Sequence, residues 1–248
     1  MALQFLPGTV VQKRVWSEGL FTLSVACPGV NPFEAGQFLQ LGLPLPEKHL
    51  HRPYSVASPH GEILDFFIVL VEEGELTPKL WKLRTGDSVD VASKAVGSFT
   101  LSHVPNANCI WLIATGTGLA PYIAMLRHGD IWNRFAHVIL VHGVRYPSDL
   151  AYQEELHSFS QNHGNQFRFV PVISRAESPG ALSGRITTAI ENGSLETIAG
   201  QKFAADNSVA MMCGNPQMLD DTESLLNERK MFRHKLSAPG HIVVERYW

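Results

Sequence analysis

The spacing of apolar residues changes part-way along this 248-residue chain. Up to about Phe99, apolar and polar side chains alternate in short runs, among them Leu20 to Val25, Gln37 to Leu43 and Ile63 to Val71. Alternation of this kind, interrupted by glycine and proline, is typical of antiparallel strands, and the short, even spacing favours a small barrel. From about Cys109, apolar strands alternate with helical stretches, which predicts a parallel α/β sheet.

This change of period predicts two domains. The chain is long enough to bury one large core or two ordinary ones. The polar segment from Leu101 to Asn108, which contains Pro105, is the expected linker. We therefore predict an antiparallel β-barrel domain over residues 1–102 and a parallel α/β domain over residues 103–248.

One helix is expected among the strands of the first domain. The segment Thr77 to Leu83 has a helix-compatible pattern, with Thr77 as its expected cap and Pro78 in its first turn. A different apolar stretch, Cys109 to Leu126, has nearly the length of a membrane span, but Gly116, Gly118 and Pro121 interrupt it. A buried strand, a glycine turn and a helix explain it better, so no membrane partner is predicted.

Composition and charge exclude several classes of function. With 45% hydrophobic and 17% charged residues the chain is a folded globular protein rather than a disordered one. A net charge of −3 gives no support for a nucleic-acid partner. The three scattered cysteines argue against a disulfide framework and against a zinc or iron–sulfur site, so no metal is predicted. Because the N-terminus lacks a signal-peptide pattern, we expect a cytoplasmic protein.

Gly116 and Gly118 give the first indication of a nucleotide site. They separate the first strand of the α/β domain from a helix, where glycines let backbone N–H groups approach a pyrophosphate. By itself the pattern is equally consistent with a plain tight turn. Pro121 also stands where a dinucleotide fingerprint has its third glycine.

Basic residues follow the next two strands. An NAD(H) site places a carboxylate about 20 residues after the glycines, and no acid ends a strand there. Instead Arg145 ends one strand, Ser174 and Arg175 end the next, and Arg185 follows soon after. Each arginine alone can be a solvated strand end. Together they suit a ribose phosphate, which favours NADP(H) over NAD(H).

The stretch HRPYS at residues 51–55 places unusual chemistry in an apolar region. In an extended strand Arg52 and Tyr54 lie on one face and Ser55 on the other. An anionic, flat ligand suits this combination of side chains.

Two further segments combine a structural and a functional interpretation. Cys213 precedes Gly214 and Asn215 at the end of the fourth strand. Composition alone favours a buried thiol there, whereas the position is one where α/β sheets bind ligands. The strand-like end of the chain, from His241 to Trp248, is either an aromatic cap on the barrel or an aromatic wall for a flat cofactor.

In their order along the chain, the motifs RPYS, FIVL, GELT, ATGTGLAP, ISR, CGNP and the closing ERYW resemble the ferredoxin–NADP(+) reductases. The resemblance is to the bacterial flavodoxin/ferredoxin type that ends in Tyr-Trp, and it covers nearly the whole chain. It implies a flavoenzyme with FAD and NADP(H) as cofactors. Hydride would pass between NADP(H) and FAD, and single electrons between FAD and ferredoxin or flavodoxin. The family also suggests a monomer.

The resemblance implies roles for individual residues. Arg52 would contact the FAD pyrophosphate, Tyr54 would stack on the isoalloxazine ring and Ser55 would hydrogen-bond near flavin N5. Further FAD contacts would come from Pro53, Phe67, Ile68, Val69, Leu70, Gly74, Glu75, Leu76, Thr77, Thr117, Tyr247 and Trp248. The NADP(H) site would comprise Gly116, Gly118, Arg145, Ser174, Arg175, Arg185, Gly214 and Asn215. Hydride transfer would be aligned by the catalytic residues Ser55, Cys213 and Glu245.

Two departures and two alternatives accompany this interpretation. Phe67 stands where a tyrosine is common, and Glu75 brings a negative charge into a loop that faces phosphate. The alternatives are an NADH-dependent reductase that feeds an oxygenase and a flavin-binding module without turnover. For an acidic carrier, Lys79, Lys82 and Arg84 form a local basic cluster, although a solvated helix face explains it more simply.

Overall fold

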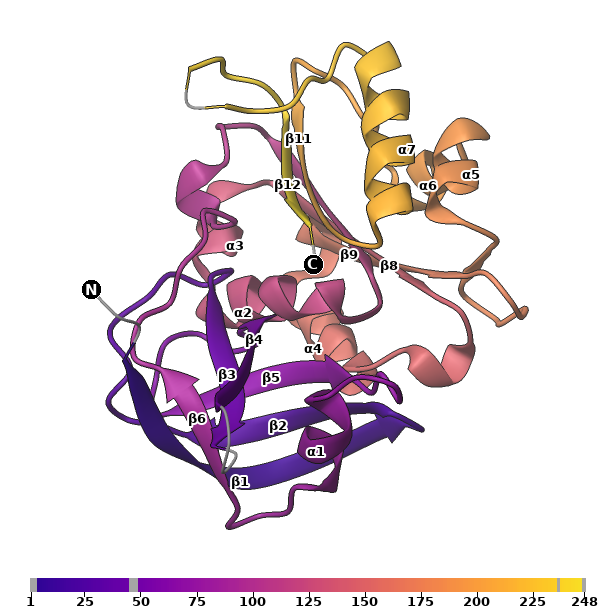
Figure 1. The fold of residues 1–248 in the computed structure, drawn as a ribbon. Coiled ribbons are helices and arrows are strands. Elements are labelled where there is room, and N and C mark those ends of the chain that lie inside the picture. Colours follow the sequence, from indigo (N-terminus) through magenta and orange to yellow (C-terminus); the bar gives the residue numbers. More distant parts are fainter. Residues whose placement is uncertain (1–3, 45–48, 236, 247–248) are drawn as a thin grey trace. The chain divides into compact units, whose positions relative to one another are not determined.

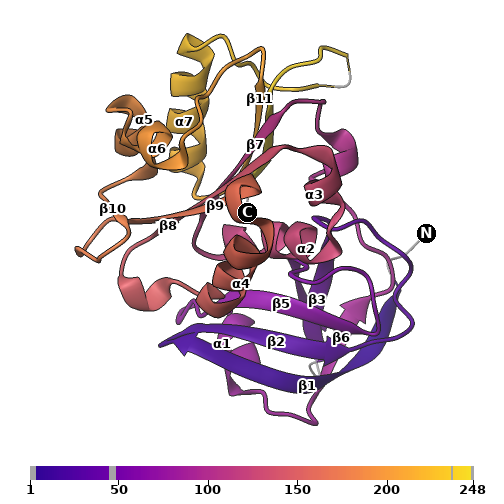
Figure 2. The same ribbon diagram turned by 180° about the vertical axis from the view of Figure 1, so that it is seen from behind.

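The computed structural model describes residues 4–44, 49–235 and 237–246. It divides into two compact units, one comprising Met1–Leu101 with Ala120–His128 and the other Ser102–Leu119 with Gly129–Trp248. Figures 1 and 2 show their elements from opposite sides. The change between units falls near the predicted linker, but helix α2 (Ala120–His128) groups with the first unit, whereas we expected all of residues 103–248 together.

The first unit contains a six-stranded sheet in the order β4-β3-β6-β1-β2-β5, and all its strand pairs are antiparallel, as predicted. Its strands are β1 (Phe5–Ser17), β2 (Leu20–Ala26), β3 (Phe38–Pro44), β4 (His49–Ser55), β5 (Ile63–Val69) and β6 (Ser88–Ala92). Beyond the end of β4, a bridge from Val56 to Phe66 joins the two outer strands. The sheet therefore closes on itself and encloses a core that includes Phe21, Leu39 and Leu41.

Helix α1 (Thr77–Lys82) lies in the expected segment and buries Leu80 completely. The predicted cap is wrong, because the residue before the helix is Leu76 and no side chain caps it. The Thr77 hydroxyl instead donates to the Val71 carbonyl at 3.0 Å and accepts from the Val71 amide at 2.9 Å. Thr77 therefore fixes the loop between β5 and α1.

Helix α2 has its own attachments within the first unit. The Arg127 guanidinium donates to Asp65 at 2.7 Å and to the Ala57 carbonyl at 2.9 Å, and Tyr122 lies 5.8 Å from Phe99 between ring centroids. These contacts attach the helix to the barrel, and every residue from Ala120 to Leu126 is buried.

The second unit contains a parallel sheet in the order β10-β9-β8-β7-β11-β12, as predicted. Its strands are β7 (Cys109–Thr115), β8 (His137–Val144), β9 (Phe167–Ile173), β10 (Leu182–Ser183), β11 (Ser208–Gly214) and β12 (Ile242–Arg246). Its helices are α3 (Asp130–Arg134), α4 (Gln153–His163), α5 (Ile186–Glu191), α6 (Ser194–Ala199) and α7 (Pro216–Glu228). Short 3-10 turns lie at Leu101–His103, Gly116–Leu119, Pro147–Asp149 and Gly164–Gln166.

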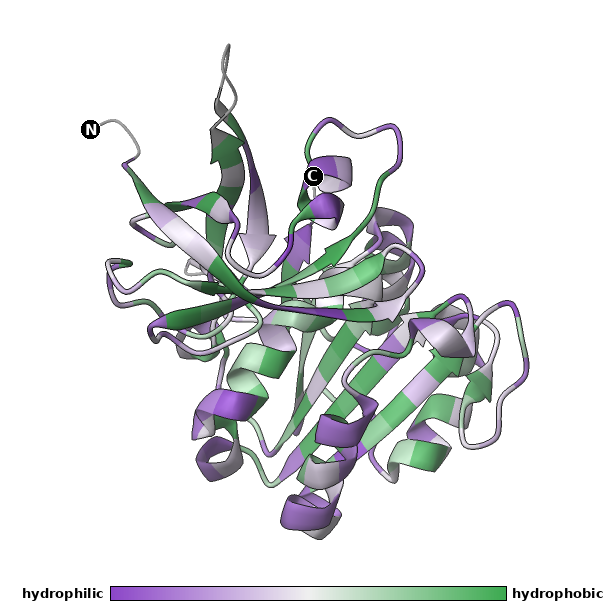
Figure 3. Cartoon of the chain, turned by 90° about the horizontal axis from the view of Figure 1, so that it is seen from below, coloured by the Kyte–Doolittle hydropathy of each residue, from purple (hydrophilic) through white to green (hydrophobic). Residues whose placement is uncertain are grey.

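Helices α5, α6 and α7 lie together on one face of this sheet (Figure 1). Their apolar side chains share a core with alternate strand residues, among them Trp111, Val141 and Met212. The strands are accordingly mostly hydrophobic, while outer helix turns are hydrophilic (Figure 3). The apolar stretch that begins at Cys109 forms β7, the first strand of this unit along the chain. A glycine turn and α2 follow it, as predicted. No helix in the described ranges is long and apolar enough to cross a membrane.

Candidate functional site

The carboxyl ends of the parallel strands bring several predicted residues to one edge of the second unit. Strand β7 ends at Thr115, β8 at Val144, β9 at Ile173 and β11 at Gly214. In open α/β sheets this edge is where ligands bind. Gly116, directly after β7, has a φ of +52°, and a side chain there would meet no atom within 4 Å. Glycine is therefore needed for its left-handed backbone rather than for lack of space.

The turns after β7 and β11 approach each other closely. A Cβ on Gly118 would lie 2.5 Å from the Cys213 carbonyl oxygen. Gly214 has a φ of +133°, and a Cβ there would overlap the Thr115 hydroxyl. That hydroxyl accepts a hydrogen bond of 2.7 Å from the Asn215 amide, which joins the two turns. The sequence interpretation named the glycines but missed Thr115, although it lies inside the ATGTGLAP motif.

Asn215 has a second, structural role. Its side-chain oxygen accepts from the Met218 amide at 3.1 Å and caps α7, and Pro216 occupies the first turn. Asn215 is exposed, so its backbone and side-chain NH2 group can still face a ligand. The cap holds the end of β11 in a fixed direction.

Cys213 and Glu245 lie opposite each other on paired strands. The register of β11 and β12 aligns them, and the Cys213 thiol lies 4.0 Å from a Glu245 carboxylate oxygen. Cys213 is fully buried and Glu245 is partly exposed. The structure thus brings together two of the three predicted catalytic residues, while Ser55 belongs to the first unit.

The basic residues follow neighbouring strands. The Arg175 amide donates to the Arg145 carbonyl at 3.0 Å, so the backbones after β8 and β9 remain paired at these positions. The Ser174 hydroxyl donates to the Val144 carbonyl at 3.2 Å, and Arg185 precedes α5. All four predicted residues are exposed, and in the described part of the chain none of the three arginines forms an ion pair with a carboxylate. Their positive charges are available to an anion.

In the first unit, RPYS occupies the end of β4. Arg52 and Pro53 are exposed, Tyr54 is partly buried against the barrel core, and Ser55 is buried. Burial raises the pKa of Tyr54 to about 12, although the Arg52 charge acts in the opposite direction. The phenol is therefore neutral near pH 7, and a flat hydrogen-bond donor lies beside a guanidinium.

The strand register explains why RPYS and FIVL belong together. Val56 bridges to Phe66, and the Ala57 amide donates to the Asp65 carbonyl at 2.8 Å. Tyr54 lies two residues before this bridge and Ile68 two residues after it, so the two motifs lie on chain segments that the bridge joins. Ile68 points into the barrel core, its strand neighbour Phe67 is buried on the opposite face of β5, and Val69 is 47% exposed.

The GELT segment, residues 74–77, follows β5 and leads into α1. Leu76 is buried in the barrel core, Glu75 is exposed, and the Gly74 amide donates to the Val71 carbonyl at 2.9 Å. The hydrogen bonds of Thr77 described above close the same loop. Thr117 is partly exposed in the turn after β7 in the second unit, and Tyr247 and Trp248 lie outside the described residues.

His142 is a buried polar residue that the sequence interpretation did not include. It lies on β8 with no exposed surface, and its Nε2 is 3.0 Å from the Gly116 carbonyl oxygen. A histidine within an otherwise apolar strand, LVHGV, was the available signal. Its partner is the first glycine of the turn after β7.

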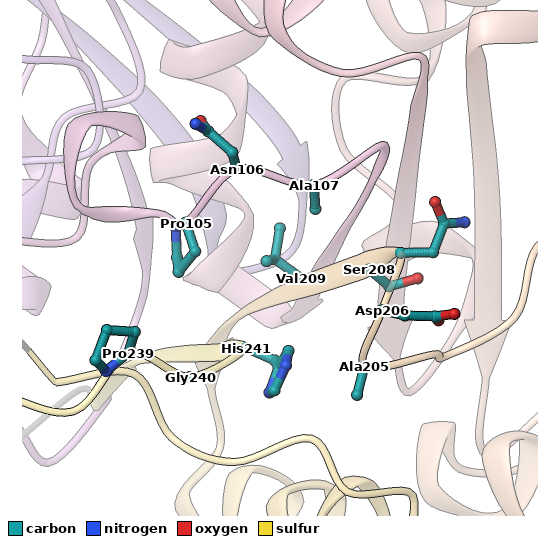
Figure 4. A pocket seen from close by; sticks show the side chains of 11 residues that line it. Pro105, Asn106, Ala107, Ala205, Asp206, Ser208, Val209, Pro239, Gly240 and His241 are labelled. Atoms are coloured by element: carbon teal, nitrogen blue, oxygen red, sulfur yellow. The ribbon is translucent and has the colours of Figure 1, made fainter.

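A pocket of about 170 Å³ opens at the opposite edge of the same sheet. Asn106, Asp206 and His241 are among the residues that line it (Figure 4). These residues lie beside the starts of β7, β11 and β12. A strand of this length separates the two edges by about 20 Å, so the pocket is not part of the glycine-turn site.

Comparisons with known proteins agree with this geometry. Residues 112–224 match the family model described as "Oxidoreductase NAD-binding domain". The Escherichia coli (strain K12) flavodoxin/ferredoxin–NADP reductase is 41% identical over 246 residues, which cover 98% of this chain and 99% of the relative. The chain belongs to this reductase family.

Other members of the family span the same length. The Pseudomonas aeruginosa ferredoxin–NADP reductase is 33% identical over 248 residues, covering 96% of this chain and 95% of the relative. A crystal structure of the Neisseria gonorrhoeae ferredoxin NADP+ reductase with bound FAD and NADP is 31% identical and has a TM-score of 0.93. The similarity covers 98% of this chain and 99% of that one. The predicted family and two-part architecture are confirmed.

The residues of this reductase fit the two dinucleotides. In the first unit, an exposed guanidinium, a neutral phenol and the exposed Val69 offer charge, a flat ring and apolar surface to a flavin dinucleotide. In the second unit, glycines keep the backbone open beside a cluster of exposed arginines. Each arrangement suits the chemistry of an aromatic ring joined to phosphates.

Proposed function

We propose that this chain is a flavodoxin/ferredoxin–NADP(+) reductase that binds FAD on its β-barrel unit and NADP(H) at the carboxyl edge of its parallel sheet. The observation that carries the nucleotide assignment is the paired backbone of Arg145 and Arg175. Two exposed guanidinium groups thus follow adjacent strand ends, with the Ser174 hydroxyl next to them. This arrangement favours the ribose phosphate that distinguishes NADP(H) from NAD(H).

Bound FAD supplies the redox chemistry, because it takes up a hydride and releases electrons one at a time. The chain's own residues bind and orient. Arg52 would neutralise the FAD pyrophosphate, Tyr54 would stack on the flavin ring, and Ser55 would donate a hydrogen bond near N5. The turns at Gly116 and Gly214 would hold the nucleotide, while Cys213 and Glu245 would define where its nicotinamide lies. Catalysis then depends chiefly on alignment.

The electron partner in this proposal is ferredoxin or flavodoxin, and the enzyme acts as a cytoplasmic monomer. Full-length similarity to reductases named for both carriers supports the first part. The test is reduction of a purified bacterial flavodoxin or ferredoxin by NADPH in the presence of this protein. Reduction of free dye without reduction of either carrier would contradict this part.

The nucleotide assignment is tested by anaerobic visible spectra of the FAD-loaded protein, recorded before and after one equivalent of NADPH or NADH. We expect fast bleaching of the flavin by NADPH and slow bleaching by NADH. Arg175→Ala should reduce the preference for NADPH over NADH by about tenfold or more, since one charge-assisted contact is worth about 1.5–3 kcal/mol.

Arg168 provides a matched control for that variant. It is an exposed arginine on the same strand, β9, but near its opposite end. Arg168→Ala should leave the preference unchanged. Equal bleaching by both nucleotides in the unmodified protein would retain the flavin site and reject the phosphate site.

A further inference from the structure

His142 is a buried polar side chain on β8, a strand of the parallel sheet whose buried residues are otherwise apolar. Its strand neighbours are Ala114 on β7 and Pro171 on β9. It is fully buried, as is Leu140, and Val144, which also shares its face of β8, is nearly so. A buried polar group destabilises the folded state unless a hydrogen bond compensates for its lost hydration. The contacts of this imidazole therefore indicate its role.

The imidazole has one polar partner in the described structure. Nε2 lies 3.0 Å from the Gly116 carbonyl oxygen, and Nδ1 has no hydrogen-bond partner among the described residues. A carbonyl can only accept, so the proton must be on Nε2. Burial lowers the pKa of His142 to about 4, against the opposing effects of the Gly116 hydrogen bond and the Asp149 charge. The side chain is thus a neutral donor fixed in one tautomer.

This hydrogen bond sets the direction of a peptide group. The Gly116 carbonyl and the Thr117 amide belong to the same planar trans peptide, so they point in opposite directions. With the carbonyl directed to His142, the Thr117 N–H points away from the sheet interior. Gly116 has φ +52°, and a Cβ at this residue would meet no atom within 4 Å, so no packing against this position holds the turn.

The other side of the turn is restrained separately. There the Thr115 hydroxyl accepts from the Asn215 amide at 2.7 Å, which fixes the end of β7 to the turn after β11. The carbonyl of Gly116 is one residue farther along and depends on β8. Two neighbouring strands thus hold successive residues of the same turn.

We propose that His142 is a positioning residue for the bound nucleotide: its Nε2–H holds the Gly116 carbonyl and thereby turns the Thr117 amide toward the ligand. The proposal rests on the proposed function, in which NADP(H) lies against this turn. His142 touches no ligand itself. Its effect falls on the part of the nucleotide common to NADP(H) and NAD(H), because the turn that it holds follows β7, whereas the arginines proposed for the extra phosphate follow β8, β9 and β10.

The test compares His142→Leu with His142→Gln in the FAD-loaded protein. Leucine fills the space without a donor, whereas the glutamine amide can place an N–H close to the position of Nε2. We expect the dissociation constants of NADP+ and NAD+ to rise by a similar factor, about tenfold, in the leucine variant. The glutamine variant should remain within about threefold of the unmodified protein. FAD content and thermal midpoint are recorded for each variant.

Each outcome decides the proposal. Unchanged binding in the leucine variant, equal loss in both variants, or loss confined to NADP+ would overturn it. Loss of both nucleotides that glutamine restores would support it, and a general loss of packing would not show such restoration. Failure of the proposed phosphate site has a different signature, because Arg175→Ala would then leave the preference for NADPH unchanged whatever His142 does.

Discussion

The two units present their candidate ligand surfaces in different ways. In the β-barrel unit, side chains carry the chemistry, since Arg52 and Tyr54 project from a regular strand. In the α/β unit, the backbone carries much of it, because Gly116, Gly118 and Gly214 allow two turns to approach or to adopt left-handed conformations. The α/β unit should therefore be sensitive to the addition of a methyl group at a glycine, and the β-barrel unit to the truncation of a ligand-facing side chain.

The polar side chains that the two units hold away from solvent also differ: Asp65 is partly buried and His142 is fully buried. Asp65 in the first unit is held by the Arg127 guanidinium at 2.7 Å and the Ser24 hydroxyl at 2.6 Å. His142 in the second unit has a single partner, a turn carbonyl, among the residues described. The first arrangement stabilises a fold, and the second restrains a loop at the cost of an unsatisfied nitrogen.

The largest effect is expected from Gly214→Ala. The methyl group would overlap the Thr115 hydroxyl, and alanine is strained at a φ of +133°. Backbone strain and overpacking together should reduce the free energy of unfolding by about 4 kcal/mol, measured by urea titration. Gly61→Ala is the control, because it has open space and no left-handed φ, and it should change stability by less than about 1 kcal/mol. Equal effects would break the comparison.

A smaller loss is expected from Asp65→Asn. The substitution leaves the Arg127 charge, which is only 24% exposed, without its carboxylate partner. Because the pair is only partly buried, we expect about 2.5 kcal/mol of lost stability, below the range for breaking a fully buried pair. Glu62→Gln, an exposed acid near the start of the same strand, should be nearly neutral. A neutral Asp65→Asn would show that helix α2 does not depend on this ion pair.

Acid should destabilise the protein through His142. Its pKa is about 4 in the folded state against 6.5 ordinarily, so the unfolded chain binds more protons between these values. The stabilisation is complete above pH 6.5 and is lost as the pH falls toward 4, with about 2 kcal/mol lost between pH 7 and 5. His142→Gln should lose less over that interval in urea titrations at each pH. Parallel pH profiles for both proteins would contradict the neutral, buried imidazole.

The smallest effect concerns the aromatic ring in the first unit. Tyr54→Ala should weaken FAD binding about tenfold, because a stacked ring contributes about 1 kcal/mol beyond its burial. Tyr54→Phe retains the ring and should bind FAD within about threefold. Equilibrium dialysis of the flavin-free protein measures both constants. If phenylalanine fails as badly as alanine, the phenol rather than stacking makes the contact.

Much of the fold could be predicted because the periodicity is local. Alternating runs such as Leu20 to Val25 form antiparallel strands, and the apolar run from Cys109 forms the central parallel strand. Strand β1 was not predicted, because most of its 13 residues are partly or fully exposed and their burial does not alternate regularly. The expected cap at Thr77 was wrong because the β5–α1 loop offered its hydroxyl two backbone partners.

The sequence by itself determined the two patterns of apolar residues, the glycine turns and the arginines at strand ends, since spacing along the chain specifies all of these. Only the tertiary structure decided which of them meet. The β11–β12 register aligned Cys213 with Glu245, the fold placed α2 with the barrel, and strand packing brought His142 to the Gly116 carbonyl. Contacts between residues far apart in the sequence depend on strand order and register, which local patterns do not specify.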